Sequence, residues 1–366
     1  MKIMTVLGTR PEIIRLSLII KALDKCTDHT LVHTGQNYDL SLGKIFFDDL
    51  QLRKPDYYLG VKAASFAEQI AKIFTETEKV IKKVRPDRLL ILGDTNSGLV
   101  SIVARRMGIP VYHMEAGNRC FDGKVPEEVN RRVIDHSSNI LLPYTHGSRE
   151  NLLREGIEPE RIYVVGNPIN EVINSFSAEI DASAVHKKLK LEHGKYFLVT
   201  LHREENVDDK ERLSDLFTAL KKIQKRYKVP VICSLHPRTK ARMKKFGLTI
   251  KNKNIVFLKP LGFFDFISLE KAALCVITDS GTVQEECCIF KVPNVTAREV
   301  TERPETVEVG SNILAGTDPE TILSSVRIAI DGARDWQVPT EYQAENVTGA
   351  VVKIITGFNR LAIYKK

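Results

Sequence analysis

The sequence predicts an α/β fold in which short apolar strands alternate with helices and pair into doubly wound parallel sheets. Two observations lead to this prediction. Short apolar runs alternate along the chain with longer segments whose apolar residues recur every three or four positions, the pattern of repeated strand–helix–strand units. The chain has 366 residues, so we expect two domains, because one hydrophobic core stops growing at roughly 250–300 residues.

The first half of the chain contains six apolar runs that we predict to be strands. They are residues 3–7, 30–33, 88–92, 111–114, 140–142 and 162–165. Two of the segments between them, residues 67–84 and 99–107, carry apolar residues at helical spacing. This order of elements predicts a first domain over residues 1–169.

The strand pattern weakens between residues 176 and 195 and then restarts. Five further apolar runs occupy residues 196–200, 231–234, 255–258, 274–278 and 292–296. We therefore predict a second α/β domain over residues 170–349. Apolar residues from Val347 to Leu361 recur at helical spacing, which predicts an amphipathic C-terminal helix that caps the second domain or packs on the first.

The composition is typical of a soluble globular enzyme, with 43% hydrophobic and 27% charged residues. The formal net charge is +8, and its main clusters, residues 221–228 and 240–245, lie in segments with helical spacing. A solvated helix face explains these clusters better than a nucleic-acid-binding surface does. Their positive charge also suits attraction of an anionic small molecule.

The cysteines and the apolar runs bear on metals, disulfides and membranes. The six cysteines show no Cys-x-x-Cys or Cys/His spacing, so we expect no structural zinc site and no disulfide framework. The first residues form too short an apolar run for a signal peptide, and no apolar run reaches the ~20 residues that a membrane span needs. We therefore predict a cytoplasmic protein that has neither a membrane nor a nucleic acid as its partner.

Charged residues gather after the predicted strand at residues 111–114. Glu115 and Arg119 follow it closely, and Glu127 and Arg131 lie in the next segment. In open parallel sheets, ligands bind at the carboxyl ends of the strands, and carboxylates beside guanidiniums suit proton transfer next to an anionic substrate. A solvated loop would explain any one of these residues, but it does not explain the whole set.

Two other turns in the first half carry candidate residues. Asp94 follows the strand at residues 88–92; alone it is most simply a helix N-cap, but its place at the same sheet edge as Glu115 also suits a catalytic carboxylate. Gly8-Thr-Arg-Pro-Glu12 follows the first strand and opens a helix, so Arg10 lies by a helix N-terminus, which favours anions. An exposed arginine in a turn fits equally well. The motif is neither G-x-G-x-x-G nor a Walker motif, which argues against a nicotinamide or P-loop site.

In the second half of the chain, polar residues again follow the predicted strands. His202 and His236 each follow a predicted strand; one such histidine is usually structural, but two at equivalent places favour ligand contact. Ser280 and Gly281 precede a predicted helix, where free amides would form a diphosphate cradle. Glu286, one turn further, could accept hydrogen bonds from a ribose diol or simply stabilise the helix dipole.

Taken together, these residues form an ordered set of motifs that resembles the non-hydrolysing UDP-N-acetylglucosamine 2-epimerases. The matching motifs are Gly8-Thr-Arg-Pro-Glu12, Gly93-Asp-Thr95, Glu115-Ala-Gly117, Pro126-Glu-Glu-Val-Asn-Arg131, His202-Arg203, Asp279-Ser-Gly281 and Thr301-Glu-Arg-Pro-Glu305. The resemblance implies the B-type glycosyltransferase fold, with two Rossmann-like domains facing a cleft and a C-terminal helix, residues 350–366, returning to the first domain. It also implies a homodimer that needs no cofactor, neither nicotinamide nor metal.

The resemblance further implies the reaction and the roles of the candidate residues. A base takes the proton from carbon 2 of the sugar while UDP leaves carbon 1, and the resulting glycal is protonated on its other face as UDP re-adds. Two faces need two proton carriers with separated pKa values. The acid/base candidates are Asp94, Glu115 and Glu127, and His202 would assist the departure of UDP. The substrate-binding candidates are Arg10, Arg15, Arg131, His236, Ser280, Gly281, Glu286 and Arg303.

Three positions depart from the commonest pattern of this family. Arg15 stands where a lysine is usual, Asn118 where a leucine is usual and Thr282 where a second glycine is usual. The run Glu115-Ala-Gly-Asn-Arg-Cys-Phe121 resembles a subgroup that acts on UDP-linked 6-deoxy-2-acetamido sugars, so the sugar stays open between UDP-N-acetylglucosamine and a 6-deoxy analogue. Three other functions also stay open: a glycosyltransferase of the same fold, a hydrolysing epimerase that releases UDP, and a non-catalytic nucleotide-sugar sensor.

Overall fold

The computed structural model describes residues 1–36 and 40–357. They divide into two compact units, of which unit 1 contains Met1–Ser175 and the described residues from Thr340 onward, and unit 2 contains Phe176–Pro339. The chain thus leaves unit 1 after Ser175 and not after residue 169, because the helix that begins at Ile169 packs on the first helix of the chain. Among the described residues, no helix combines the length and apolar character needed to cross a lipid bilayer.

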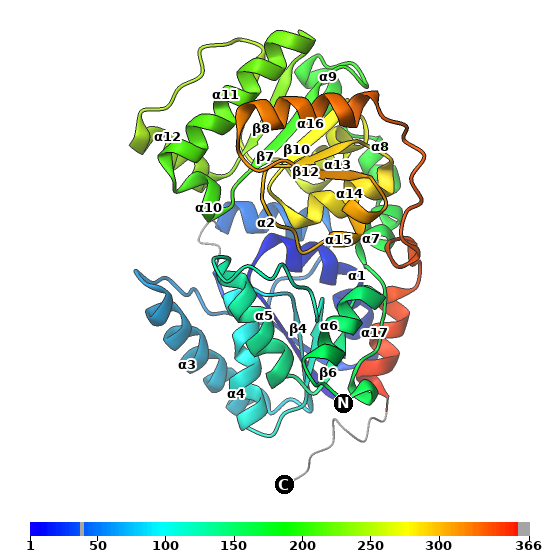
Figure 1. Ribbon diagram of the computed structural model, residues 1–366. Coiled ribbons are helices and arrows are strands. Elements are labelled where there is room, and N and C mark those ends of the chain that lie inside the picture. Colours follow the sequence, from blue (N-terminus) through cyan, green and yellow to red (C-terminus); the bar gives the residue numbers. More distant parts are fainter. Residues whose placement is uncertain (37–39, 358–366) are drawn as a thin grey trace. The chain divides into compact units, whose positions relative to one another are not determined.

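Unit 1 contains one parallel sheet with the strand order β3-β2-β1-β4-β5-β6; β4 and β6 are labelled in Figure 1. The strands are β1 Lys2–Leu7, β2 Asp28–His33, β3 Tyr57–Tyr58, β4 Arg88–Leu92, β5 Val111–Met114 and β6 Ile140–Leu142. The sheet grows outward in both directions from β1, so the gap between the carboxyl ends of β1 and β4 is a topological switch point, the place where such sheets bind ligands.

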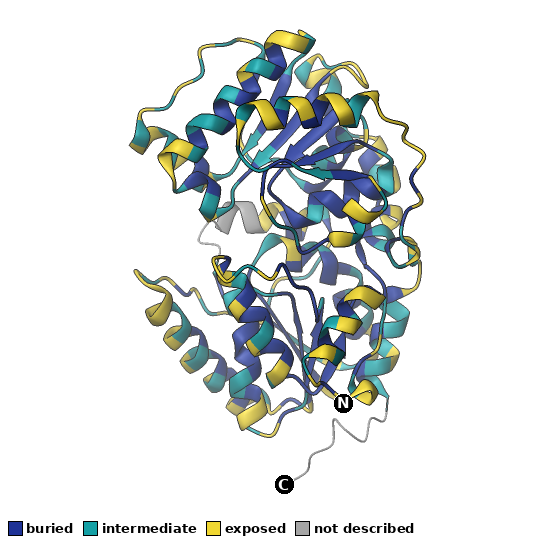
Figure 2. Cartoon of the chain, in the orientation of Figure 1, coloured by how far each residue is buried: buried dark blue, intermediate teal, exposed yellow. Residues whose placement is uncertain are grey.

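The sheet of unit 1 is covered by helices. The α-helices are α1 Arg10–Cys26, α2 Leu40–Asp49, α3 Phe66–Val84, α4 Val100–Arg106, α5 Pro126–Ser137, α6 His146–Arg154, α7 Ile169–Ser175 and α17 Val347–Thr356. Short 3₁₀ turns span Asn96–Leu99, Pro159–Arg161 and Thr340–Gln343. The central strands are buried (Figure 2), which explains why they are continuous apolar runs and do not alternate apolar with polar residues.

The predicted strand at residues 162–165 is wrong. Ile162 forms only an isolated bridge with Leu141, because the neighbouring strand β6 has three residues and is followed by Pro143, which has no N–H to continue the ladder. Two strands, β3 and β12, went unpredicted.

Unit 2 repeats the strand order of unit 1, with a parallel sheet ordered β12-β11-β10-β7-β8-β9. The strands are β7 Phe197–Leu201, β8 Val231–Leu235, β9 Ile255–Leu258, β10 Cys275–Thr278, β11 Asn294–Thr296 and β12 Asn312–Leu314. The α-helices are α8 Ser177–Asp181, α9 Val185–Leu189, α10 Glu204–Val207, α11 Lys210–Tyr227, α12 Pro237–Phe246, α13 Phe263–Lys271, α14 Gly281–Phe290, α15 Pro304–Glu308 and α16 Pro319–Asp331. Its switch point lies between β7 and β10.

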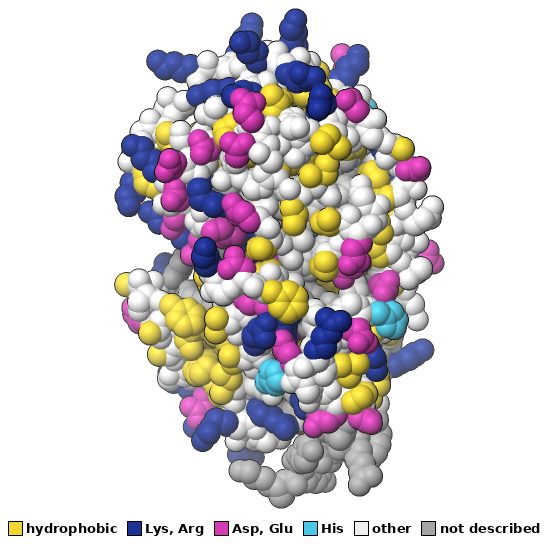
Figure 3. Space-filling view, viewed as in Figure 1, with side chains coloured by type: hydrophobic (Ala, Val, Ile, Leu, Met, Phe, Trp, Pro, Cys, Tyr) yellow, Lys and Arg dark blue, Asp and Glu magenta, His cyan; other side chains and the backbone are white. Residues whose placement is uncertain are grey.

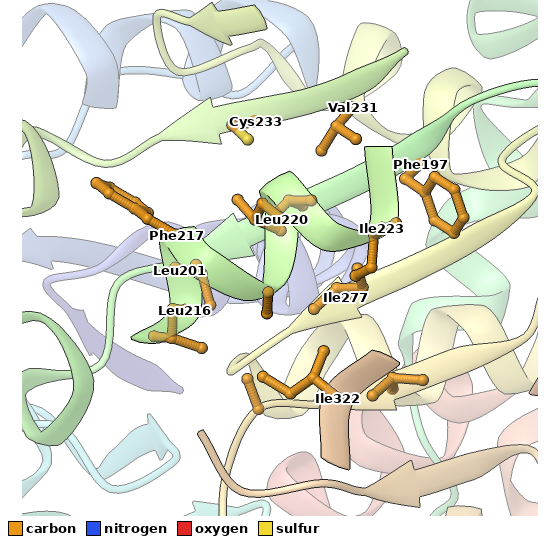
Figure 4. Close-up of a cluster of buried hydrophobic side chains, with 14 of the residues drawn as sticks. Phe197, Leu201, Leu216, Phe217, Leu220, Ile223, Val231, Cys233, Ile277 and Ile322 are labelled. Atoms are coloured by element: carbon orange, nitrogen blue, oxygen red, sulfur yellow. The ribbon is translucent and has the colours of Figure 1, made fainter. Parts of the chain in front are cut away.

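The core of unit 2 shows why its helices lie on the sheet. Leu216, Leu220 and Ile223 recur on one side of α11 and pack with Phe197 of β7 and Ile277 of β10 (Figure 4). All five side chains are almost fully buried, and burying one such side chain contributes about 1.5–3 kcal/mol to folding. This packing fixes the two strands whose carboxyl ends form the switch point.

The C-terminal helix α17 belongs to unit 1. It packs on α1, and its buried residues Val347, Val351 and Ile355 lie four positions apart. The Arg88 guanidinium at the start of β4 donates a hydrogen bond to the Ile355 carbonyl. The predicted helix extended to residue 366, but residues 358–366 lie outside the described residues. With two such units, the predicted α/β class with two Rossmann-like domains is confirmed.

Candidate functional site

Asp94 and Glu115 follow neighbouring strands of unit 1. Leu92 and Met114 are paired in register, so Gly93 and Glu115 leave the sheet together; a β-carbon built on Gly93 would lie 3.6 Å from the Glu115 Oε2. Glu115 has a φ of 64°, a left-handed conformation that costs a non-glycine residue about 1–2 kcal/mol. Its Oε1 accepts a hydrogen bond of 3.2 Å from the Asn118 amide.

Arg131 of α5 holds Asp94. Its Nε and Nη2 donate to the Asp94 Oδ2 at 3.0 and 2.8 Å, and its Nη1 donates to Glu128. The Asn130 amide donates to the Asp94 backbone carbonyl at 3.0 Å. Asp94 is not the N-cap of the following 3₁₀ turn; Thr95 holds that position, without a capping side-chain hydrogen bond. The Asp94 side chain stays 29% exposed, so a substrate can reach it.

The other predicted acid, Glu127, lies in the first turn of α5, four residues before Arg131. It is half-buried, whereas Arg131 is buried. Pro126 begins this helix, a position where its missing N–H costs nothing. Glu127 therefore lies on the same helix as Asn130 and Arg131, the two residues that bind Asp94.

A buried polar network supports the two catalytic-candidate turns. The Asp135 carboxylate is bound by His113 Nδ1 at 2.8 Å, the Arg119 guanidinium at 2.8 Å and the Gly117 N–H at 3.2 Å. The other His113 nitrogen bonds the Gly93 carbonyl at 2.9 Å. Burial alone would raise the pKa of Asp135, but His113 and Arg119 outweigh it and lower that pKa. Asp135 was not predicted from the sequence, because nothing in its helical segment signals a contact with a distant loop.

Glu12 joins the turn after β1 to the turn after β4. Its Oε2 accepts hydrogen bonds from the Gly8 N–H at 2.7 Å and the Thr9 N–H at 2.6 Å, and its Oε1 accepts one from the Thr95 hydroxyl at 2.8 Å. Burial raises the pKa of Glu12 to about 7, against the lowering effect of these bonds. Sequence reasoning gave Glu12 no role, although Thr9-x-x-Glu12 is a readable capping box.

The two predicted basic residues of α1, Arg10 and Arg15, differ in position along the helix and in burial. Arg10 is half-buried at the first position of the helix, with its guanidinium carbon 5.8 Å from the centre of the Phe46 ring. Arg15 is 2% exposed and lies more than one turn further along α1. Gly8, just before this helix, is required sterically, because a β-carbon there would lie 2.2 Å from the hydroxyls of Ser97 and Thr34.

Asp279 organises the switch point of unit 2. Its buried carboxylate accepts hydrogen bonds from the backbone N–H groups of His202 and Arg203, both at 2.9 Å, and from the Asn206 amide at 3.2 Å. The His202 ring Nδ1 lies 3.1 Å from Asp279 Oδ1. Burial would raise the pKa of Asp279, but His202 and the donated hydrogen bonds lower it. The structure therefore joins the β7 and β10 turns, and sequence reasoning had given Asp279 no role.

The two predicted histidines of unit 2 lie side by side. The ring centres of His202 and His236 are 5.9 Å apart, and the His202 side chain is 37% exposed. His236 caps α12, because its Nδ1 accepts a hydrogen bond of 3.2 Å from the Arg238 N–H. The proton of a neutral His236 therefore sits on Nε2.

The N-terminus of α14 carries Ser280 and Gly281. Ser280 occupies the N-cap position but makes no capping side-chain hydrogen bond; its hydroxyl pairs with that of Thr282 at 3.0 Å. Because the Ser280 side chain does not cap this end, its amides are suited to bind an anion. A β-carbon on Gly281 would lie 3.7 Å from the Arg303 guanidinium carbon, so Arg303 lies against this helix start.

Arg303 and Glu286 are both buried near this helix. The Arg303 Nε donates to the buried carboxylate of Glu285, so a large part of its charge is balanced within unit 2. Glu286 is 5% exposed and is hydrogen-bonded to Glu270 of α13. Across the residues that the structure describes, no group of three or more His, Cys, Asp or Glu side chains could hold a metal ion.

The predicted residues thus form two sets. In unit 1, the turns that carry Arg10, Asp94 and Glu115 are joined through Glu12 and His113, and α5 adds Glu127 and Arg131. In unit 2, the set comprises His202, His236, Ser280, Gly281, Glu286 and Arg303. Arg15, the remaining candidate of unit 1, is buried in α1.

Comparisons with known proteins agree over nearly the whole chain. A sequence profile of the family described as UDP-N-acetylglucosamine 2-epimerase matches residues 21–356. A protein of Methanocaldococcus jannaschii named UDP-N-acetylglucosamine 2-epimerase is 46% identical over 348 residues, which cover 93% of this chain and 95% of that protein. A Pseudomonas aeruginosa protein named UDP-2,3-diacetamido-2,3-dideoxy-D-glucuronate 2-epimerase is 35% identical and covers 90% of this chain and 92% of its own length.

A solved structure gives the same result. The crystal structure of the Methanocaldococcus jannaschii UDP-GlcNAc 2-epimerase, in complex with UDP-GlcNAc and UDP, matches with a TM-score of 0.93 and 44% identity. The match covers 97% of this chain and 99% of that one. The profile, the relatives and the structure therefore all place this chain in the UDP-N-acetylglucosamine 2-epimerase family.

Proposed function

We propose that this protein inverts carbon 2 of a UDP-linked 2-acetamido sugar without hydrolysing it, and that its substrate is UDP-N-acetylglucosamine. The observation that carries the proposal is the placement of Asp94 and Glu115 at the ends of adjacent strands in unit 1. An inversion needs groups that can exchange protons with carbon 2. Both carboxylates are held by hydrogen bonds, Asp94 by Arg131 and Glu115 by Asn118.

The proposed reaction is an elimination followed by an addition. A carboxylate takes the carbon 2 proton while the carbon 1–oxygen bond to UDP breaks, so that a carbon 1–carbon 2 double bond forms. A protonated carboxyl then gives a proton to the opposite face of carbon 2, and a UDP phosphate oxygen re-forms the bond to carbon 1. Asp94, Glu115 and Glu127 are the proposed proton carriers, and Arg131 orients Asp94 through two hydrogen bonds.

Unit 2 is the proposed binding site for UDP. The start of α14, with Ser280 and Gly281, would bind the diphosphate, because helix amides and the helix dipole favour anions. Glu286 would bind the ribose, since it lies five residues after Gly281 and therefore about 8 Å further along the helix. His202 would assist the departure of UDP, positioned by its contact with Asp279.

The remaining basic residues complete the proposal. Arg10 and Arg131 would counter the negative charge of the phosphates, and Arg131 also binds Asp94 and Glu128. Arg303 would support the phosphate site from beneath Gly281. His236, beside His202, and Arg15 remain proposed substrate-binding residues.

The sugar itself is the finer part of the proposal. UDP-N-acetylglucosamine is favoured because the 46% identical relative and the matching crystal structure both carry its name. The second candidate is a 6-deoxy analogue, favoured by the loop Glu115–Phe121. Turnover of the two nucleotide sugars, measured side by side at equal concentrations, decides between them through the ratio of kcat/KM.

We further propose that the protein is a homodimer and acts in the cytoplasm. Both proposals come from the resemblance of the ordered motifs to the family. Analytical ultracentrifugation at micromolar protein concentration tests the first, with a sedimenting mass of two chains as the expected result.

Turnover in heavy water tests the reaction. We expect the recovered nucleotide sugars, both epimers, to carry deuterium at carbon 2, because the proton passes through groups that exchange with solvent. Transfer of the sugar to an acceptor without deuterium uptake would indicate a glycosyltransferase. Stoichiometric release of UDP with the free sugar would indicate a hydrolysing epimerase. Binding of UDP without any turnover would indicate a sensor, and each of these three results contradicts the proposal.

A further inference from the structure

Glu270 of α13 is a fully buried carboxyl to which the proposed chemistry gives no part. Its side chain is 0% exposed, and its Oε1 accepts a hydrogen bond of 3.2 Å from the Cys287 thiol. Its Oε2 receives no N–H or conventional O–H donor from the described residues. A buried acceptor left in this way costs about 1–3 kcal/mol, so this oxygen requires an explanation.

The explanation lies in the contact between Glu270 and Glu286. Its carboxyl group is hydrogen-bonded to the carboxyl group of Glu286 on α14. Two carboxyls in such contact in a buried site cannot both be ionised, so they share one proton. Burial, and then the charge of Glu286, raise the pKa of Glu270 well above its ordinary value. Because its pKa is the one that is raised, we take Glu270 as the carboxyl that holds the shared proton and donates it to Glu286.

This arrangement fixes the direction of the Glu286 side chain. Glu286 lies in the second turn of α14 and is 5% exposed. A glutamate has several rotamers, and ordering one costs up to about 2 kcal/mol of side-chain entropy. The Glu270 carboxyl is itself held by the Cys287 thiol. Its hydrogen bond restricts the Glu286 side chain before a ligand binds, so less entropy is lost on binding and the remaining lone pairs of Glu286 are already oriented.

We propose that Glu270 is a positioning residue for the nucleotide, which donates the hydrogen bond that orients Glu286 toward the ribose hydroxyls. The inference rests on the proposed function, because it takes Glu286 to be the ribose-binding residue. Glu270 contacts no part of the substrate; its effect passes entirely through Glu286.

The test compares two ligands on three variants by titration calorimetry. The ligands are UDP and 2′,3′-dideoxy-UDP, which lacks the ribose hydroxyls that Glu286 would bind. The variants are Glu270→Met, which keeps the volume but donates nothing; Glu270→Gln, whose amide still donates to Glu286 and whose carbonyl still accepts from Cys287; and Gln224→Leu, a control on α11. Gln224 is a buried polar residue of unit 2 whose partner is Asn252, outside the proposed site.

We expect the wild type to bind UDP at least tenfold more tightly than the dideoxy ligand, since a hydrogen bond to a charged group is worth about tenfold or more. Glu270→Met should lose most of this ratio through weaker UDP binding, with its affinity for the dideoxy ligand unchanged. Glu270→Gln should retain most of the ratio, and Gln224→Leu all of it. Equal weakening of both ligands by Glu270→Met, an unchanged ratio in that variant, or loss of the ratio in Glu270→Gln overturns the inference.

A second measurement does not depend on the folding of Glu270→Met. The infrared spectrum at about pH 8.5, above the pKa of Glu12 and of ordinary carboxyls, should contain a protonated-carboxyl band in the wild type that Glu270→Gln removes. Absence of the band from the wild type overturns the inference. Neither measurement requires turnover, so a failure of the proposed epimerisation is detected separately, as a lack of deuterium at carbon 2.

Discussion

At the scale of single residues, Glu115 carries the clearest structural cost. It is a non-glycine residue with a φ of 64°, although glycine would adopt this conformation without strain. The structure tolerates the strain because the surrounding loop is tied down by Asp135 and Asn118. Strained backbone of this kind gathers at functional sites, which supports a direct role for the Glu115 carboxylate.

The first prediction concerns this carboxylate and its neighbour. Glu115→Gln and Asp94→Asn should each lower kcat by orders of magnitude, because neither amide can carry the proton, while the affinity for UDP changes little. Steady-state kinetics and UDP titration measure the two quantities. Glu150→Gln serves as the control, since Glu150 is an exposed acid of unit 1 whose side chain is 55% exposed.

The control should keep wild-type kcat. Near-normal kcat in both Glu115→Gln and Asp94→Asn would remove these residues from the mechanism. A parallel loss of UDP affinity in either variant would instead give that residue a binding role.

A second prediction at this scale concerns stability against pH. Burial raises the pKa of Glu12 to about 7, so the folded state binds an extra proton between pH 4.5 and pH 7 and becomes less stable as pH rises. Burial lowers the pKa of His33 to about 4, so the folded state binds one proton fewer between pH 4 and pH 6.5 and becomes more stable as pH rises. The two effects oppose each other, and each amounts to about 3 kcal/mol.

Glu12→Gln should therefore steepen the rise of unfolding free energy between pH 4 and pH 6.5, because only the His33 effect remains. His33→Asn should do the opposite, and its side-chain oxygen can still accept from the Gly35 N–H that His33 Nδ1 now binds. Urea unfolding at a series of pH values measures both. Curves parallel to that of the wild type would show that these two groups do not titrate as their burial implies.

At the scale of elements, the two sheets place their functional turns at equivalent positions. The switch point between β1 and β4 carries Glu12 and Asp94, and that between β7 and β10 carries His202 and Asp279. In both units an acid from one turn binds donors on the other turn. The strand order thus brings the two turns of each switch point together, and a buried carboxylate links them.

The helix α17 provides a prediction at this scale. Ile355→Ala should destabilise unit 1 by about 2–4 kcal/mol, because it removes a fully buried side chain from the contact with α1. Lys353→Ala, an exposed position on the same helix, should change stability by less than about 0.5 kcal/mol. Chemical denaturation followed by hydrogen exchange measures the loss and locates it. Faster exchange confined to unit 2 would contradict the assignment of α17 to unit 1.

At the scale of the whole molecule, the positive charge is unevenly distributed. Thirteen Lys and Arg but no Asp or Glu lie between Leu216 and Phe264, a segment that spans part of α11, α12 and β9. Lys and Arg side chains accordingly predominate at the upper end of unit 2 in Figure 3. Three of these thirteen are paired with acids elsewhere in unit 2, namely Lys222, Arg238 and Arg242. The remaining excess suits the attraction of an anionic nucleotide to the unit proposed to bind it.

The last prediction separates the roles of the two units. UDP at about a hundred times its dissociation constant should raise the free energy of unfolding of the unit that binds it by about 2.7 kcal/mol. Hydrogen exchange should slow in the turns after β7 and β10 and at the start of α14, because the ligand holds their amides. Protection limited to the β4 and β5 turns of unit 1 would show that unit 2 is not the UDP-binding unit.

The prediction from sequence was most successful where the signal is local. Continuous apolar runs identified the central strands, because a parallel strand is buried on both faces. Residues 162–165 misled it, since an apolar run does not show whether a neighbouring strand continues far enough to pair. Among the proposed site residues, Asp94, Glu115 and His202 were chosen because they follow such runs closely.

The sequence by itself determined the alternation of strands and helices, the division into two α/β units and the ordered motifs of the family, because periodicity and short motifs are properties of neighbouring residues. Only the tertiary structure decided that Glu12 binds Thr95, that Asp135 holds His113 and Arg119, and that Glu270 faces Glu286. These contacts join residues from separate elements. Whether a buried acid is satisfied, paired or protonated depends on which groups the fold brings to it, and no spacing along the chain encodes that.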